Sequence, residues 1–115
     1  GHGGMVSLAT SADQTLDLLT GHDEVWIAAV NGPTTTVIAG TPAGLAEVTA
    51  AAETAGLRPR TIPVDYASHT PHVERIREQL RQLAAPITPR AGDIPLYSTV
   101  TAAPIDGEAL DAEYW

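Results

Sequence analysis

The sequence predicts an α+β fold in which short strands and amphipathic helices alternate along the first half of the chain. Three observations predict it. Apolar runs of strand length are separated by turn residues, start and stop residues bracket two helical segments, and a longer amphipathic segment follows them. Apolar residues make up 43% of the 115 residues, with 4% aromatics and no Phe. The core is therefore expected to consist of aliphatic side chains.

The first predicted elements are a strand and a helix. Residues 5–9 form a short apolar run that is typical of a strand. Ser11 and Gln14 have the spacing of a capping box, so a helix is expected to begin after Ser11 and to end at Gly21. The residues expected on the buried face of this helix are Ala12, Leu16 and Leu19.

Two further strands and a second helix are expected next. Residues 25–30 are continuously apolar and residues 35–39 are rich in β-branched residues, with turn chemistry at residues 31–34 between them. The second helix is expected to begin at Thr41-Pro42 and to stop at Gly56. Its inward-facing residues are expected to be Leu45, Val48, Ala52 and Ala55.

A last strand is expected at residues 58–64, which completes the order β-α-β-β-α-β over roughly residues 4–64. This is the order of the ferredoxin-like, split βαβ arrangement, in which two helices cover one face of a four-stranded antiparallel sheet.

Residues 65–115 do not fit into that unit. Thr70-Pro71 begins a third helix, and Pro86 and Pro89 end it. Residues 94–101 are expected to form a strand, and residues 109–115 the start of a further helix. A helix, a strand and a partial helix cannot close a core by themselves, so they indicate pieces of a larger α/β body.

The third helix carries an apolar stripe at three- and four-residue steps. Its members are Val73, Ile76, Leu80 and Leu83. With nothing in the chain to cover it, the stripe predicts self-association or domain swapping.

The charge and the cysteine content exclude several classes of function. The net charge is −8, and all six basic residues are Arg, so the chain lacks the positive surface that nucleic-acid binding requires. No apolar run has the length of a membrane span. The absence of Cys excludes disulfides and thiolate metal sites within the chain, and it agrees with a cytoplasmic protein.

The segment Tyr-Ala-Ser-His at residues 66–69 lies between the last predicted strand and the third helix. Rigid elements on both sides can hold His69 while its ring faces a cleft. Taken alone, His69 could equally be a capping or packing histidine. His69 and His72 are three residues apart, but no third ligand is apparent, so a metal site is not expected.

Four segments resemble, in order, the acyltransferase domains of modular type I polyketide synthases. They are Val25–Pro33 with the following Val37–Gly40, then Pro63–His69, Pro95–Thr101 and Leu110–Trp115. The resemblance covers essentially the whole chain. It implies that residues 4–64 are the ferredoxin-like small subdomain and that residues 65–115 are a C-terminal fragment of the large, α/β-hydrolase-like subdomain.

The resemblance also implies a reaction and its partners. In that family a serine in a Gly-His-Ser-x-Gly turn attacks the thioester of malonyl- or alkylmalonyl-coenzyme A. The acyl group then passes to the phosphopantetheine thiol of an acyl carrier protein, and no cofactor is bound directly. The implied partners are the acyl-coenzyme A, the carrier protein, and neighbouring domains such as the ketosynthase and its linker.

Particular residues take roles by the same resemblance. His69 is the general base that activates the serine, since a serine hydroxyl is a weak nucleophile without such a partner. Tyr66 and Ser68 belong to the form associated with methylmalonyl extenders, because Ser68 leaves volume that Phe fills in malonyl-loading members. Asn31 is placed near the acyl–coenzyme A cleft.

One departure from the family pattern is important. The chain contains no Gly-x-Ser-x-Gly, so the nucleophile is expected upstream, together with the arginine that binds the extender carboxylate and the oxyanion-hole donors. The chain alone is therefore expected to be inactive. Two alternatives stay open: residues 4–64 could form a free-standing ferredoxin-like module that binds a ligand or protein, or the chain could be a linker region of a megasynthase.

Overall fold

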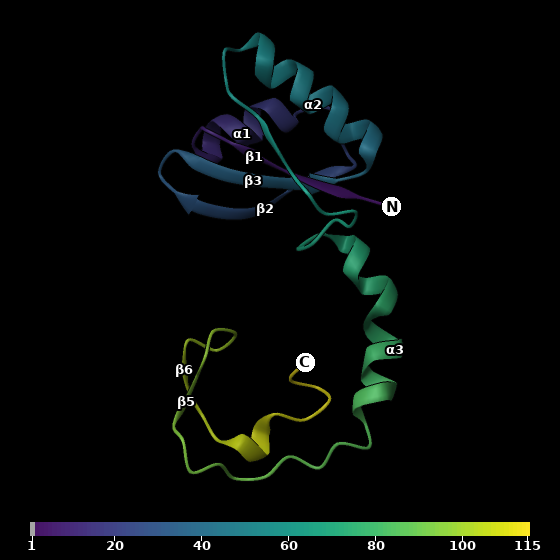
Figure 1. Cartoon of the computed structure of the whole chain (residues 1–115), viewed down its shortest axis with the longest axis vertical. Coiled ribbons are helices and arrows are strands. Elements are labelled where there is room, and N and C mark those ends of the chain that lie inside the picture. Colours follow the sequence, from purple (N-terminus) through teal and green to yellow (C-terminus); the bar gives the residue numbers. More distant parts are fainter. Residues whose placement is uncertain (1) are drawn as a thin grey trace. The chain divides into compact units, whose positions relative to one another are not determined.

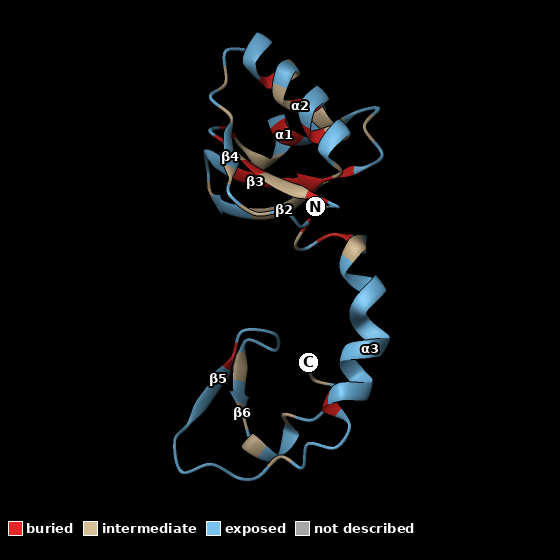
Figure 2. Ribbon diagram, turned by 45° about the vertical axis from the view of Figure 1, so that its right-hand side comes forward, coloured by how far each residue is buried: buried red, intermediate tan, exposed pale blue. Residues whose placement is uncertain are grey.

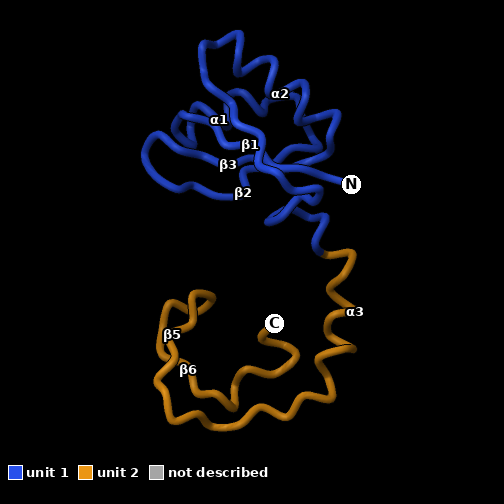
Figure 3. The backbone as a smooth tube through the Cα atoms, viewed as in Figure 1, with its two compact units in different colours: residues 1–73 blue, residues 74–115 orange. Residues whose placement is uncertain are grey.

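The computed structural model describes residues 2–115. The chain divides into two compact units, Gly1–Val73 and Glu74–Trp115 (Figure 3). The segment around His69 therefore belongs to the same compact unit as the sheet.

The first unit contains the predicted order of six elements (Figure 1). They are β1 (Gly4–Leu8), α1 (Ala12–Leu19), β2 (Val25–Gly32), β3 (Thr35–Gly40), α2 (Pro42–Thr54) and β4 (Arg60–Ile62). The strands form one sheet in the order β2-β3-β1-β4, and every neighbouring pair is antiparallel.

Both helices cover one face of this sheet. Val6 of β1 lies opposite Ile38 of β3, and both side chains point into a core that also contains Leu45 and Val48 of α2, with Leu19 of α1 packed against it. Because side chains alternate along a strand, Met5 and its partner Ala39 lie on the opposite face of the sheet.

The predicted helix ends are confirmed. The Ser11 hydroxyl accepts a hydrogen bond from the Gln14 backbone N–H (3.2 Å), and the Thr41 hydroxyl accepts one from the Gly44 backbone N–H (3.2 Å). Gly56, which follows α2, has φ +77°, a conformation that glycine adopts without strain. Local capping chemistry therefore sets where these helices begin and end.

The predicted buried faces of α1 and α2 were partly wrong. Leu16 is 57% exposed, whereas Thr15 is fully buried, because the Thr15 hydroxyl donates to the Ser11 carbonyl (2.8 Å) and thus satisfies its hydrogen-bonding requirement inside the core. In α2 the burial of Leu45, Val48 and Ala52 is confirmed. Ala55 is exposed because it is already the C-cap residue.

Two strands differ in length from the prediction. β2 runs through residues 31–32, which were predicted as turn, and register shifts follow Ile27 and Val30. The loop to β3 is therefore Pro33-Thr34 alone. β4 is limited to Arg60–Ile62, because Pro59 and Pro63 on either side lack the N–H that a sheet ladder needs.

The second unit begins with the predicted third helix, α3 (Glu74–Ala84), which a 3-10 turn at Pro71–Val73 precedes. The apolar stripe is exposed throughout, with values between 43% for Val73 and 69% for Leu83. Figure 2 shows α3 exposed along nearly its whole length. No helix in residues 2–115 combines the length and the apolar character that a membrane span requires.

The last part of the chain folds differently from the prediction. The strand expected at residues 94–101 is β5 (Leu96–Ser98), which pairs with an unpredicted β6 (Ala103–Ile105). The Ser98 hydroxyl accepts hydrogen bonds from the N–H groups of Val100 and Thr101, which turns the chain back. The expected helix at residues 109–115 does not form, because the Asp111 side chain accepts from the N–H groups of residues 113 and 114 and closes a turn instead.

Candidate active site

The predicted site segment is the loop between β4 and α3. Within it, Ala67 is buried (4% exposed), Ser68 is half-buried, and Tyr66 (57%) and His69 are exposed. His69 has φ +57°, a left-handed conformation that is uncommon for residues other than glycine. The imidazole is therefore accessible on a loop whose neighbouring residue Ala67 packs into the fold.

Gly3 allows the loop to lie close to the N-terminal segment. A Cβ placed on Gly3 would lie 2.6 Å from the Ala67 backbone nitrogen and 3.1 Å from the Tyr66 carbonyl carbon. Both are backbone atoms, which cannot rotate away as a side chain can. Only glycine at this position permits the observed approach.

Thr70 holds the other end of the loop. It is 5% exposed. Its hydroxyl donates to the Ala67 carbonyl (2.8 Å) and accepts from the His72 backbone N–H (3.2 Å). These two bonds join the residues on either side of His69.

His72, in the 3-10 turn Pro71–Val73, contacts the sheet. Its ring contacts Trp26 of β2 edge-on, with 5.5 Å between the ring centroids and 68° between the planes. Trp26 lies opposite Ala39, so it is on the sheet face that the helices do not cover. No signal in the sequence paired Trp26 with His72.

Asn31 lies elsewhere on the same strand. It falls within the register shift between Val30 and Gly32, where one residue of β2 has no partner on β3. At the usual rise per residue it is about 16 Å along the strand from Trp26. The Trp26–His72 contact and Asn31 therefore lie toward opposite ends of β2.

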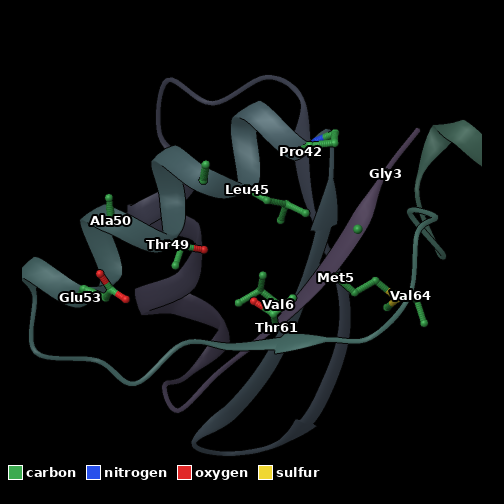
Figure 4. A pocket seen from close by; sticks show the side chains of 12 residues that line it. Gly3, Met5, Val6, Pro42, Leu45, Thr49, Ala50, Glu53, Thr61 and Val64 are labelled. Atoms are coloured by element: carbon green, nitrogen blue, oxygen red, sulfur yellow. The ribbon is translucent and has the colours of Figure 1, made fainter. Parts of the chain in front are cut away.

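A separate groove lies between α2 and the strands β1 and β4 (Figure 4). Its volume is about 490 Å³, and its lining includes Leu45, Thr49 and Glu53 from α2 and Thr61 from β4. The four predicted site residues are not among its lining residues. We therefore place the candidate site at the loop rather than in this groove.

The chemistry available at the loop is that of an accessible imidazole. Histidine can take a proton from a nucleophile and return it to a leaving group. Within residues 2–115, no cluster of three or more His, Cys, Asp or Glu side chains could hold a metal ion. The loop therefore offers an acid–base group.

Comparison with known sequences covers the whole chain. Residues 1–115 match the acyl transferase domain family. The chain is 51% identical to polyketide synthase GfsE of Streptomyces halstedii and 48% identical to erythronolide synthase EryA2 of Saccharopolyspora erythraea. The alignments cover 100% and 98% of this chain but only 3% of each relative, so the chain spans a small part of those proteins.

Solved structures agree with the sequence matches. The acyltransferase domain from module 8 of the salinomycin polyketide synthase superimposes with a TM-score of 0.84 at 46% identity, over 100% of this chain and 27% of that one. A loading acyltransferase from the avermectin modular polyketide synthase gives 0.83 at 38% identity, over 100% of this chain and 38% of that one. The mixed α/β fold therefore matches polyketide synthase acyltransferase structures. The chain belongs to the acyl transferase domain family, in the form found in modular polyketide synthases.

Proposed function

We propose that this chain supplies the general base and the selectivity residues of an acyltransferase that loads extender units onto an acyl carrier protein. His69 is the base, and Tyr66 and Ser68 contact the extender. The observation that carries the proposal is the exposed, left-handed His69 on a loop held by Gly3 and Thr70.

The reaction consists of two acyl transfers. His69 takes the proton of a serine hydroxyl while the serine oxygen attacks the thioester carbonyl of the acyl-coenzyme A. The carbon–sulfur bond breaks, and the imidazolium protonates the departing thiolate. In the second transfer His69 takes the proton of the phosphopantetheine thiol, whose sulfur attacks the acyl-serine ester. The serine oxygen leaves and recovers a proton from the imidazolium.

The extender favoured by this site is methylmalonyl rather than malonyl. The small side chain of Ser68 leaves room for a methyl group on the α-carbon of the acyl unit. Tyr66, which is largely exposed, is available as a wall of the acyl pocket. A single methyl group changes discrimination by about 1–3 kcal/mol. Asn31, at the other end of β2, is proposed as a contact for the more distant part of the acyl-coenzyme A.

The strand topology supports the first part of the proposed domain assignment. Residues 4–64 form the ferredoxin-like small subdomain, which the strand order β2-β3-β1-β4 and the two helices on one sheet face support. Residues 65–115 contribute to the large subdomain. The serine is proposed to come from another stretch of polypeptide, because this sequence contains no Gly-x-Ser-x-Gly. The partners are the carrier protein and the neighbouring synthase domains.

A transacylation assay tests the role of His69. In a complete acyl transferase domain that carries this chain, His69→Ala should lower kcat by about 10²–10⁴-fold, the usual contribution of a general base. His22→Ala is the control for removal of a histidine outside the loop, because the His22 side chain pairs with Glu47 of α2 (3.2 Å). The 115-residue chain alone should show no turnover above its own His69→Ala variant. Equal rates for the complete domain with and without His69 would refute the proposal.

A further inference from the structure

We propose that Thr70 is a positioning residue for His69, which acts by holding the base in its left-handed conformation. The inference rests on the proposed function of His69 and adds a residue to which the family resemblance assigned no role. It predicts that the Thr70 hydroxyl is needed for the rate of acyl transfer although it touches no substrate.

The Thr70 hydroxyl acts as a donor and as an acceptor within the loop. It donates to the Ala67 carbonyl, two residues before His69, and accepts from the His72 N–H, three residues after it. The Thr70 carbonyl also accepts from the Val73 N–H (3.1 Å). Thr70 is 5% exposed, so water cannot readily replace these bonds.

A left-handed histidine needs such support. A non-glycine residue with φ +57° is strained and persists only where its surroundings hold it. If the bond to the Ala67 carbonyl is lost, the backbone can relax to negative φ. The direction of the His69 side chain then changes, because φ sets the orientation of the Cα–Cβ bond relative to the preceding peptide.

The two residues that Thr70 connects are each fixed to the rest of the unit. Ala67 lies against Gly3, and the His72 ring lies against Trp26. The hydroxyl thus links two fixed points across His69. An ordinary N-cap makes only the bond to the helix N–H, so the bond to Ala67 distinguishes the proposed role from capping.

Three variants separate the roles of Thr70. Thr70→Ser keeps the hydroxyl. Thr70→Val keeps the size and removes both bonds. Thr70→Asp keeps an acceptor for the His72 N–H but, when ionised, has no hydrogen to give the Ala67 carbonyl. Thr15→Val is the matched control, because Thr15 is also buried and its hydroxyl donates to the backbone carbonyl of Ser11, the N-cap residue of α1.

The first measurement is the NMR cross-peak between the amide proton and the α-proton of His69 in the 115-residue chain. This distance is short in the left-handed conformation, so the cross-peak is strong. It should stay strong in Thr70→Ser and Thr15→Val and weaken in Thr70→Asp and Thr70→Val. Thr70→Asp preserves the helix cap, so it reports on the loop even if Thr70→Val does not fold. An unchanged cross-peak in Thr70→Asp would overturn the proposal.

The second measurement is steady-state acyl transfer by the complete domain. Thr70→Val should lower kcat by about tenfold to a hundredfold, as misplaced catalytic groups do, with KM for the acyl-coenzyme A changed less than about twofold. Thr70→Ser should restore kcat. If His69→Ala is inactive but Thr70→Val keeps full kcat, the positioning role is wrong and the proposed function stands. If His69→Ala is fully active, the proposed function itself is wrong.

Discussion

Gly3 and Ala67 are in such close contact that no side chain fits between them. A Cβ on Gly3 would lie 2.8 Å from the Ala67 Cβ and 2.6 Å from its backbone nitrogen. Real Cβ atoms do not approach other atoms so closely. The residue before β1 thus determines how closely the loop carrying His69 can approach the sheet.

Gly3→Ala should therefore destabilise the first unit. The added methyl group meets backbone atoms, so the loop has to move, and overpacking of this kind costs about 1–3 kcal/mol. Urea unfolding of the 115-residue chain, followed by circular dichroism, measures the loss.

Gly4→Ala is the matched control for this substitution. A Cβ on Gly4 would meet only the Leu45 Cδ1 atom, at 3.1 Å, and that side-chain tip can move. The same chemical change one residue later should alter the free energy of unfolding by less than about 1 kcal/mol. An equal decrease in the free energy of unfolding for the two variants would show that the Gly3–Ala67 contact does not cause the destabilisation.

The parts of the fold that could be predicted from the sequence are those set by interactions between residues close together in the chain. The caps at Ser11 and Thr41 depend on hydrogen bonds within one helical turn, and both helix starts were predicted correctly. The inward face of α1 was predicted only in part, because burial of Thr15 depends on its bond to the Ser11 carbonyl. A prediction from helical periodicity assigns the buried positions to leucine rather than to threonine, because leucine is the more hydrophobic residue.

The candidate site could be predicted only in part for a related reason. A local motif identified the segment from Tyr66 to His69. The Trp26–His72 contact results from packing between segments distant in the sequence. No periodicity, cap or turn signal encodes such a contact. Only β5 of the last hairpin was predicted, because β6 contains Pro104, which argues against a strand.

The Trp26–His72 contact should couple the two residues energetically. Edge-on aromatic pairs contribute about 0.5–1.5 kcal/mol beyond their burial. A double-mutant cycle with Trp26→Leu and His72→Leu measures this coupling in the free energy of unfolding. A coupling energy of zero would mean that the rings are adjacent without mutual stabilisation.

Tyr66 and Ser68 should control the choice of extender in the complete domain. Replacing them together, Tyr66→His with Ser68→Phe, fills the space proposed for the α-methyl group. The ratio of kcat/KM for methylmalonyl- over malonyl-coenzyme A should fall by about tenfold to a hundredfold. Competition assays with both substrates measure the ratio. Tyr97→His, a change at another exposed tyrosine, should leave it unchanged, and an unchanged ratio in the double variant would exclude Tyr66 and Ser68 from selectivity.

Glu78 should make the stability of α3 depend on pH. A hydrogen bond from the Gln82 side chain (2.8 Å) and the charge of Arg81 lower the pKa of Glu78 below its ordinary value of 4.5. A lowered pKa means that the carboxylate stabilises the folded helix at higher pH. This stabilisation is lost as the pH falls through the folded-state pKa.

Glu78→Gln should therefore reduce the loss of helix signal on acidification. The measurement is circular dichroism at 222 nm between about pH 5 and pH 3, the range in which ordinary glutamates titrate. The magnitude of the helix signal should fall less in the variant than in the unaltered chain. Glu53→Gln, at an exposed position of α2, controls for removal of one negative charge. A fall identical in all three proteins would contradict the prediction.

The exposed stripe of the third helix should cause the chain to self-associate. Val73, Ile76, Leu80 and Leu83 recur at three- and four-residue steps and are between 43% and 69% exposed. This spacing is that of a helix seam which packs against another helix. Sedimentation velocity should therefore show the sedimentation coefficient rising with protein concentration. Leu80→Gln with Leu83→Gln should abolish the rise, whereas Leu16→Gln, at an isolated exposed leucine of α1, should not. A concentration-independent coefficient in the unaltered chain would show that the stripe does not drive association by itself.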